Sequence, residues 1–174
     1  MFTRTSVLVI STALMLTACS SSDETSTPAA SKSSNSAPAL TGTPVNVEVT
    51  GEAGSEPVVA ITPGDPVTEL QVTDVIVGTG DPLPAGATLT ADYVGYGGAT
   101  GQMFDASWVR GEPATFPLDN VILGWQEGLV GMQVGGRRLL VIPAELGYGN
   151  NPPPGSGIEP GETLIFVVDL VSFE

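Results

Sequence analysis

Alternation of apolar and polar residues predicts that most of this chain from residue 66 onward forms β-sheet. Runs of this kind, bounded by glycine and proline, are typical of half-buried strands. The segments with this pattern are 70–77, 88–96, 103–108, 115–118, 137–142 and 163–173. In the second of them Leu89, Ala91 and Tyr93 fall on one side, because successive side chains of a strand point to opposite faces. The first segment has a break near Asp74.

The spacing changes to that of a helix over residues 121–132. Trp125 and Leu129 are four positions apart and therefore share one helical face. The same segment contains three glycines, Gly124, Gly128 and Gly131. Each glycine costs about 0.5–1 kcal/mol relative to alanine inside a helix, so this density indicates close approach of the helix backbone to a neighbour. We expect the indole of Trp125 to form the floor of a pocket; a core tryptophan in a short helix is the alternative interpretation.

The ends of this helix and the loop after it complete the predicted fold. We expect Asp119 or Asn120 to cap the N-terminus and Gly135–Gly136 to end the helix. Residues 147–161 form a long loop rich in proline and glycine, and loops of this length in compact domains are often functional. The pattern as a whole predicts an α+β fold, an antiparallel sheet of five to six strands wrapped on one short helix.

The N-terminal part of the chain divides into three predicted segments before the main domain at 66–174. Residues 1–18 have the pattern of a signal peptide, with Arg4 near the start and an apolar run from Ser6 to Leu16 that is too short to span a bilayer. Residues 19–43 are rich in Ser, Thr, Ala and Pro and predict a disordered tether. Residues 44–65 form an extension with two possible edge strands, separated by a turn at 51–54.

Cys19 is the only cysteine of the chain, and it follows Leu16-Thr17-Ala18 directly. This arrangement resembles a bacterial lipobox, which implies that Cys19 is lipidated and becomes the first residue of the mature protein. Acyl chains contribute about 0.8 kcal/mol per buried CH₂, and two or more give a stable anchor. We therefore expect an exported protein anchored to the outer face of the cell membrane. An ordinary signal peptide with a chance cysteine is the alternative.

The composition excludes several kinds of chemistry. The 174 residues contain no histidine, which rules out a Ser-His-Asp triad, a Cys-His dyad and a histidine-ligated zinc site. The formal net charge is −14, whereas nucleic-acid binding requires clusters of Lys and Arg. No run of carboxylates has the spacing of a calcium loop. We expect no metal, no cofactor and no nucleic-acid partner, and nothing in the sequence points to an oligomer, so we expect a monomer.

Several short motifs between residues 66 and 174 occur in the order and approximate spacing of one enzyme family. They are Tyr93-Val94-Gly95, Phe104-Asp105-Ala106-Ser107, Phe116-Pro117-Leu118, Val121 to Leu129, Gly135-Gly136-Arg137-Arg138, Ile142-Pro143, Tyr148-Gly149, Ile158 and Leu164-Ile165-Phe166. In these motifs the chain resembles the FKBP-type peptidyl-prolyl cis-trans isomerases. With its lipobox it resembles the secreted forms of high-GC Gram-positive bacteria.

The resemblance implies a pocket for proline-containing polypeptides and roles for particular residues. The residues it places in the catalytic set are Tyr93, Asp105, Trp125, Tyr148 and Phe166, and those it places in substrate binding are Phe104, Phe116, Val121, Ile122 and Ile158. Trp125 would be the floor beneath the proline ring. The N–H of Ile122 and the hydroxyl of Tyr148 would donate hydrogen bonds to peptide carbonyls. Asp105 would face the twisting imide or be held by Tyr93, and Ile158 would close one wall.

One position departs from the family pattern, and it keeps a second function open. The family usually has an aromatic residue two positions before Phe116, whereas this chain has Ala114. We expect a wider or shallower pocket there, with weaker macrolide binding. The expected function is acceleration of Xaa-Pro isomerisation in exported proteins by an apolar pocket that favours the twisted imide, a rotation that needs no proton transfer and therefore no histidine. The alternatives are a non-catalytic or weakly catalytic proline-peptide-binding chaperone module and a purely structural lipoprotein domain.

Overall fold

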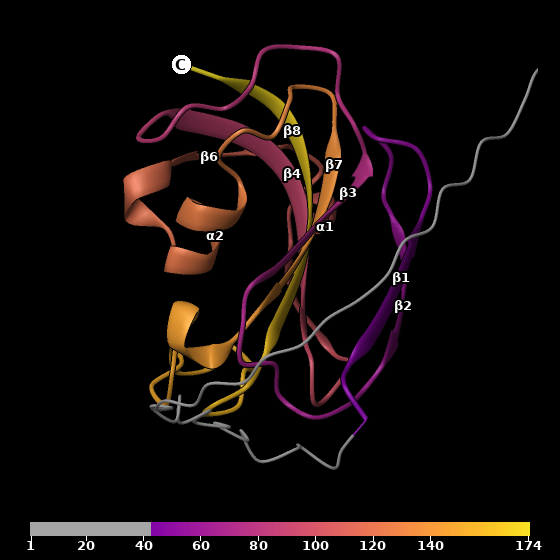
Figure 1. The fold of residues 1–174 in the computed structure, drawn as a ribbon, viewed down its shortest axis with the longest axis vertical. Helices are drawn as coiled ribbons and strands as arrows, with labels where there is room; N and C mark the ends of the chain where they lie inside the picture. The colour runs from indigo at the N-terminus through magenta and orange to yellow at the C-terminus, as the bar shows by residue number, and fades with distance from the viewer. Residues whose placement is uncertain (1–42) are drawn as a thin grey trace, which may run out of the picture. The chain divides into compact units, whose positions relative to one another are not determined.

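The computed structural model describes residues 43–174, which belong to one compact unit. The predicted signal peptide at 1–18, the anchor at Cys19 and the tether up to residue 42 lie outside these residues. A six-stranded antiparallel sheet forms the centre, with the order β3-β7-β8-β4-β5 and with β6 also paired to β4 (Figure 1). Its strands are β3 (Gln71–Ile76), β4 (Thr88–Gly97), β5 (Met103–Ala106), β6 (Ala114–Pro117), β7 (Arg137–Ile142) and β8 (Leu164–Phe173). The predicted fold class is confirmed.

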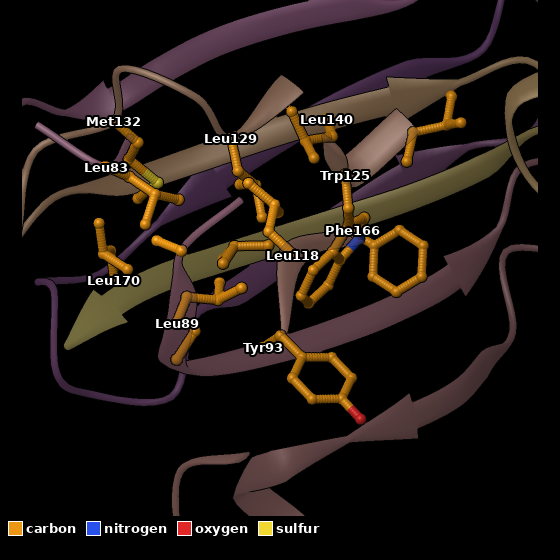
Figure 2. Packing of buried hydrophobic residues seen from close by; sticks show 14 of the residues in the cluster. Leu83, Leu89, Tyr93, Leu118, Trp125, Leu129, Met132, Leu140, Phe166 and Leu170 are labelled. Atoms are coloured by element: carbon orange, nitrogen blue, oxygen red, sulfur yellow. The ribbon is translucent and has the colours of Figure 1, made fainter. Parts of the chain in front are cut away.

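One face of the sheet packs against the helix α2 (Leu123–Gly128), which carries Trp125. The main hydrophobic cluster lies between them and includes leucines from several elements as well as aromatic side chains (Figure 2). Three shorter helices connect strands: α1 (Ser107–Arg110), η1 (Leu118–Asn120) and η2 (Ala144–Leu146). A short helix against a twisted sheet leaves an opening beside the helix, and the candidate site lies there.

The opposite face of the sheet is covered by a hairpin of β1 (Asn46–Thr50) and β2 (Val58–Thr62), which forms a two-stranded sheet of its own (Figure 1). Val47 and Val49 alternate with exposed polar residues along β1, as expected for a strand with one buried face. These valines and Ile61 belong to a second hydrophobic cluster with side chains from the back of the central strands. The sheet is thus buried on both faces.

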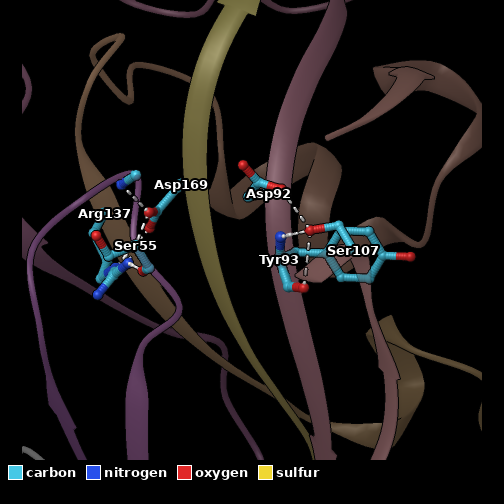
Figure 3. A network of polar contacts seen from close by, with 7 residues as sticks. Ser55, Asp92, Tyr93, Ser107, Arg137 and Asp169 are labelled. Carbon is cyan, nitrogen blue, oxygen red and sulfur yellow. Dashed lines mark hydrogen bonds and ion pairs between the residues drawn. The ribbon is translucent and has the colours of Figure 1, made fainter. Parts of the chain in front are cut away.

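Burial on both faces explains the almost uninterrupted apolar sequence of β8. Leu164 and Phe166 belong to the cluster on the helix side, whereas Ile165 belongs to the cluster on the hairpin side. Strands buried on both faces read as continuous hydrophobic runs. The exception among its buried positions is Asp169, whose carboxylate binds the fully buried guanidinium of Arg137 at 2.6 and 2.7 Å (Figure 3).

Three local predictions were wrong. The helix is six residues long instead of spanning 121–132. Val121 and Ile122 are extended and precede its first turn, and the φ of +78° at Gly131 rules out a helix that reaches residue 132. Ile122 occupies the N-cap position without a side-chain cap, so neither Asp119 nor Asn120 has the predicted role, and Gly135–Gly136 lie well beyond the helix end.

The predicted strand at 103–108 also ends early, at Ala106. Ser107 turns inward at this point: its hydroxyl donates to Asp92 Oδ1 at 2.8 Å and accepts from the backbone N–H of Tyr93 at 2.9 Å (Figure 3). The chain then forms the single turn α1, which ends at Gly111 with a φ of +76°. Trp108 joins the cluster on the hairpin side.

Candidate active site

A cavity of about 300 Å³ opens between α2, β5 and the loop that begins at Gly147. Its lining is mostly aromatic and aliphatic, with a few polar groups at the mouth. The lining residues are Tyr93, Phe104, Asp105, Phe116, Asn120, Val121, Ile122, Trp125, Tyr148 and Phe166. All the predicted site residues of the main domain except Ile158 therefore meet around one cavity. Ile158 is half-buried against the main cluster and does not line the cavity, whereas Asn120, not predicted as a site residue, does.

Trp125 forms the inner end of the cavity, and three aromatic rings stand edge-on to its indole. The ring centroids of Tyr93, Phe116 and Phe166 lie 5.4, 5.8 and 5.3 Å from it, at interplanar angles of 85–86°. Figure 2 shows the indole beside Phe166 and above Tyr93. Such edge-to-face pairs are worth about 0.5–1.5 kcal/mol beyond the area they bury. Trp125 is only 4% exposed, so its ring is held in one orientation beneath the opening.

The glycines of α2 place this tryptophan, as the sequence predicted. An ideal Cβ on Gly124 would lie at or within 3.0 Å of three side-chain atoms of Ile142, and one on Gly128 would lie 2.7 Å from a methyl carbon of Leu140. Real Cβ atoms are not found so close to other heavy atoms. The helix therefore contacts β7 through its backbone, which brings Trp125 down to the level of the sheet. The predicted close approach is confirmed at both positions.

Gly95 has a similar role on β4. An ideal Cβ there would lie 2.6 Å from the Cζ of Phe104 and 2.8 Å from the Cε1 of Phe166. Those two rings stack edge-on over the glycine, with centroids 5.5 Å apart. A side chain at Gly95 would push both rings into the cavity, so the aromatic wall depends on this glycine.

A polar network closes one side of the mouth. The Tyr93 hydroxyl donates a hydrogen bond to Asp105 Oδ2, and Arg110 donates to Asp105 Oδ1 at 2.7 Å and to the Tyr93 oxygen at 2.8 Å. The guanidinium carbon of Arg110 also lies 5.4 Å from the centroid of the Tyr93 ring. Arg110 was not predicted as a site residue. The only sequence signal was its position five residues after Asp105, which becomes informative once α1 is known to be helical.

These contacts fix the protonation states of the network. Burial and the hydrogen bond to the Asp105 carboxylate raise the pKa of Tyr93 to about 12. Burial alone would raise the pKa of Asp105, but the hydrogen bonds from Tyr93 and Arg110 outweigh it and hold that pKa below its ordinary value. At neutral pH the site therefore holds a neutral phenol, a carboxylate and a guanidinium.

Two hydrogen-bond donors remain available at the cavity. Ile122 lies in extended conformation just before α2, and its N–H meets no acceptor among residues 43–174. The Tyr148 hydroxyl likewise has no partner within the described residues, and its side chain is 37% exposed. Burial and the nearby Asp105 raise the pKa of Tyr148, so its hydroxyl keeps its proton. A bound peptide could accept hydrogen bonds from both groups without breaking an existing one.

No group of three or more metal-ligating side chains occurs in the part of the chain that the structure describes. No helix among residues 43–174 is long and apolar enough to cross a membrane. Ala114, the departure noted in the sequence, lies in β6 and packs half-buried against the main cluster without lining the cavity.

Comparisons with known proteins agree on one family. The sequence profile of the FKBP-type peptidyl-prolyl cis-trans isomerases matches residues 80–171, more than half of the chain. The FK506-binding protein of Streptomyces anulatus is 50% identical over 111 residues, which are 63% of this chain and 90% of that protein. A probable FK506-binding protein of Corynebacterium glutamicum is 45% identical over 118 residues, 67% of this chain and 98% of that protein.

Solved structures show the same fold. The crystal structure of FkpA from Escherichia coli matches with a TM-score of 0.56 and 42% sequence identity, over 62% of this chain and 49% of the FkpA chain. The crystal structure of AtFKBP13 matches with the same TM-score at 33% identity, over 63% of this chain and 96% of that one. The chain therefore belongs to the FKBP-type peptidyl-prolyl cis-trans isomerases, and it is close in sequence to the FK506-binding proteins of actinobacteria.

Proposed function

We propose that the aromatic cavity above Trp125 binds the proline ring of a polypeptide and is the place where the Xaa-Pro bond rotates. The observation that carries this proposal is the single deep aromatic floor with two unoccupied donors beside it, Ile122 N–H and Tyr148 hydroxyl. A pyrrolidine ring is apolar and compact, and it has no N–H of its own to satisfy. The donors would hold the flanking carbonyls while the ring rests on the indole.

The proposed mechanism favours the twisted state of the imide over both planar isomers. Resonance sets a barrier of about 18–20 kcal/mol, and the twisted state loses that resonance and is less dipolar. A site poor in water disfavours the planar, more dipolar form, and binding that is tighter in the twisted state accelerates rotation. No proton has to move, which agrees with a site whose Tyr93 and Asp105 keep one protonation state across the neutral range.

Asp105 has a positioning part in this scheme. Its carboxylate is held by Tyr93 and Arg110, so it presents a fixed negative charge at the mouth and cannot swing into the cavity. Tyr93 is in turn held with its ring against Trp125 and Phe116. The network thus fixes the aromatic wall from the solvent side, and we propose that it orients the substrate carbonyl as the bond turns.

We further propose that the substrates are exported proteins and that Cys19 anchors the enzyme to the outer face of the cell membrane. This rests on the signal-like residues 1–18 and on the lipobox-like segment that ends at Cys19. The test is membrane fractionation and acyl labelling of the full chain in a lipoprotein-producing bacterium, beside Cys19→Ser. Labelled wild-type protein in the membrane fraction, with the variant unlabelled, supports the anchor. Equal distribution of the two proteins contradicts it.

The alternative is a binding module that holds proline-containing segments but turns them over poorly. Ala114 is the observation that favours it, because a smaller residue beside Phe116 on β6 reduces the apolar surface near the cavity. It also leads us to propose weaker binding of the macrolide FK506 than in members with an aromatic residue there.

The deciding experiment is isomerisation of a short Xaa-Pro peptide by residues 20–174, beside Trp125→Ala and Trp108→Ala. Trp108 packs on the opposite face of the sheet and is the matched control. Acceleration by the wild type that falls at least tenfold in Trp125→Ala, but less than threefold in Trp108→Ala, supports the proposed site. Unaccelerated isomerisation with peptide binding retained supports the binding module. Equal loss in both variants contradicts the assignment to this cavity.

A further inference from the structure

Glu162 is a buried carboxylate that the proposed mechanism does not use. It lies two residues before β8, at the end of the long loop 147–161, and it is only 5% exposed. No arginine of the described chain pairs with it: the three ion pairs there involve other carboxylates. A buried charge is costly unless hydrogen bonds compensate it. The hydrogen-bond donors of the Glu162 carboxylate therefore show which segments it holds together.

Four hydrogen bonds converge on this carboxylate, and they come from two separate segments. Oε1 accepts from the N–H of Ala99 at 3.3 Å and from the N–H and hydroxyl of Thr100 at 3.2 and 3.1 Å. Oε2 accepts from the N–H of Glu159 at 2.9 Å. Gly97 leaves the space, since a Cβ at that position would overlap the carboxylate. One oxygen thus holds the β4–β5 turn, and the other holds the end of the long loop.

The first segment leads directly to one wall of the cavity. The Thr100 hydroxyl accepts a hydrogen bond from Gln102 N–H at 3.3 Å, and Gln102 immediately precedes β5. Gly97 N–H donates to the Gln102 carbonyl at 3.0 Å, which closes the turn. Phe104, on β5, lines the cavity two residues further on. The position of this wall therefore depends on a turn that the Glu162 carboxylate holds.

The second segment leads to another part of the cavity lining. Gly161 N–H donates to the Gly149 carbonyl at 2.8 Å, and this bond joins the two ends of the long loop. Gly149 follows Tyr148, which lines the cavity and carries an available hydroxyl. Glu162 N–H also donates to the Glu159 carbonyl at 3.2 Å, so the turn at 159–162 is held from both sides. Phe104 and Tyr148 come from distant parts of the sequence, and this carboxylate links the segments that carry them.

We infer that Glu162 is a positioning residue that sets the spacing between the Phe104 wall and the Tyr148 wall of the substrate cavity. This inference rests on the proposed function of the cavity. Glu162 lies behind both walls and contacts neither the floor at Trp125 nor the Asp105 network. Its loss should therefore weaken the grip on the peptide on either side of the proline and leave the rotation over Trp125 almost unchanged. The expected signature is a change in KM with kcat preserved.

The test compares Glu162→Gln with Glu159→Gln in residues 20–174. Glutamine cannot replace the carboxylate: in either orientation of the amide, its NH₂ group faces backbone N–H donors instead of accepting from them. Glu159→Gln removes the same charge from the same turn, but the structure uses only the backbone of Glu159, and that side chain is exposed. We expect KM for an Xaa-Pro peptide to rise three- to tenfold in Glu162→Gln, with kcat within twofold, and no change in Glu159→Gln.

Thr100 provides an independent variant. Thr100→Val removes one of the four donors and should raise KM by a smaller factor, whereas Thr100→Ser keeps the hydroxyl and should restore the wild-type value. Amide hydrogen exchange should become faster over 97–102 and 148–161 in Glu162→Gln, and not elsewhere. If the apparent kcat falls in proportion to the folded fraction while KM stays at the wild-type value, or if both KM and exchange stay at wild-type values, the positioning role is wrong. A wild-type chain that does not turn over the peptide contradicts the proposed function instead, and hydrogen exchange then decides the role of Glu162 by itself.

Discussion

Replacing Gly124 by alanine sets two effects of opposite sign against each other. Alanine improves helix propensity by at most about 1 kcal/mol over glycine. The new methyl group, however, would overlap the side chain of Ile142, which is fully buried and held between α2 and the sheet. Overpacking of this kind typically costs about 1–3 kcal/mol. Because Ile142 has no free space to move into, we expect steric overlap to win, with a net loss of about 1–2 kcal/mol in the free energy of unfolding.

The same overlap should reduce activity beyond what the loss of stability explains. Trp125 directly follows Gly124, and Ile122 lies two residues before Gly124. A helix pushed away from β7 therefore moves both the Trp125 floor of the cavity and the Ile122 N–H donor. We expect kcat/KM for an Xaa-Pro peptide to fall at least threefold under conditions in which the protein is fully folded. Urea unfolding followed by tryptophan fluorescence gives the stability, and peptide turnover gives the activity.

Gly131→Ala is the control for this experiment. Gly131 has a φ of +78°, and an ideal Cβ there meets no other atom within 4 Å. Alanine in this conformation costs about 1–2 kcal/mol, so the loss of stability should match that of Gly124→Ala without a push on the helix. Activity per folded molecule should stay at the wild-type level. A Gly124→Ala variant as stable as the wild type, or an equal loss of activity in both variants, would refute the reasoning.

Three further predictions follow from other parts of the structure. Arg137→Met leaves the Asp169 carboxylate buried without a cation and should lower the free energy of unfolding by about 3–5 kcal/mol, measured in urea. A second change, Asp169→Leu, should recover most of this loss, and an unchanged unfolding midpoint in Arg137→Met contradicts the prediction. The lowered pKa of Asp105 keeps its carboxylate ionised at neutral pH, so the stability that this carboxylate contributes is lost only as the pH falls through that pKa. The pKa of Tyr93, raised to about 12, keeps its phenol neutral over the same range. With no histidine in the chain, kcat/KM should stay constant within twofold from pH 6 to 9, and a bell-shaped profile would contradict the mechanism. Ala114→Phe should tighten the proposed binding of FK506 about tenfold and keep peptide turnover within threefold of the wild type. A tenfold change is close to the upper end of the about 0.5–1.5 kcal/mol that an added aromatic pair contributes. Equal affinity of the two proteins in calorimetry would reject this prediction.

The features that the sequence predicted well are local. Alternation along β4 placed Tyr93 on the same side as Leu89 and Ala91, and in the structure all three belong to the main hydrophobic cluster, with the Tyr93 ring against Trp125 and Phe116. The glycines at 124 and 128 predicted close backbone approach because few other constraints favour glycine inside a helix. In each case the physical cause lies within a few residues of the signal, so it can be read from the chain directly.

The features that it missed depend on contacts between distant segments. Arg110 becomes part of the site only because Ser107 turns inward toward Asp92 and ends β5, and no local pattern records that partner, 15 positions away. The hairpin at 46–62 has strand periodicity, but only its valines' packing against the back of the sheet shows which surface it covers. Glu162 looks like one of many surface carboxylates until its four donors are known.

The candidate site depends on both faces of β4. Tyr93 points into the cavity, while its neighbour Asp92 points to the hairpin side and accepts a hydrogen bond from Ser107, whose oxygen also accepts from the Tyr93 N–H (Figure 3). On the same side, the hairpin turn donates Gly54 N–H to Asp169 at 2.7 Å, and Asp169 is the cross-strand partner of Asp92. The hairpin and α1 together thus satisfy most of the buried polar groups behind the sheet; among the described residues, Arg137 Nη1 has no hydrogen-bond partner. Since an unsatisfied buried polar group costs about 1–3 kcal/mol, the strand that carries Tyr93 keeps its register only while these partners stay in place.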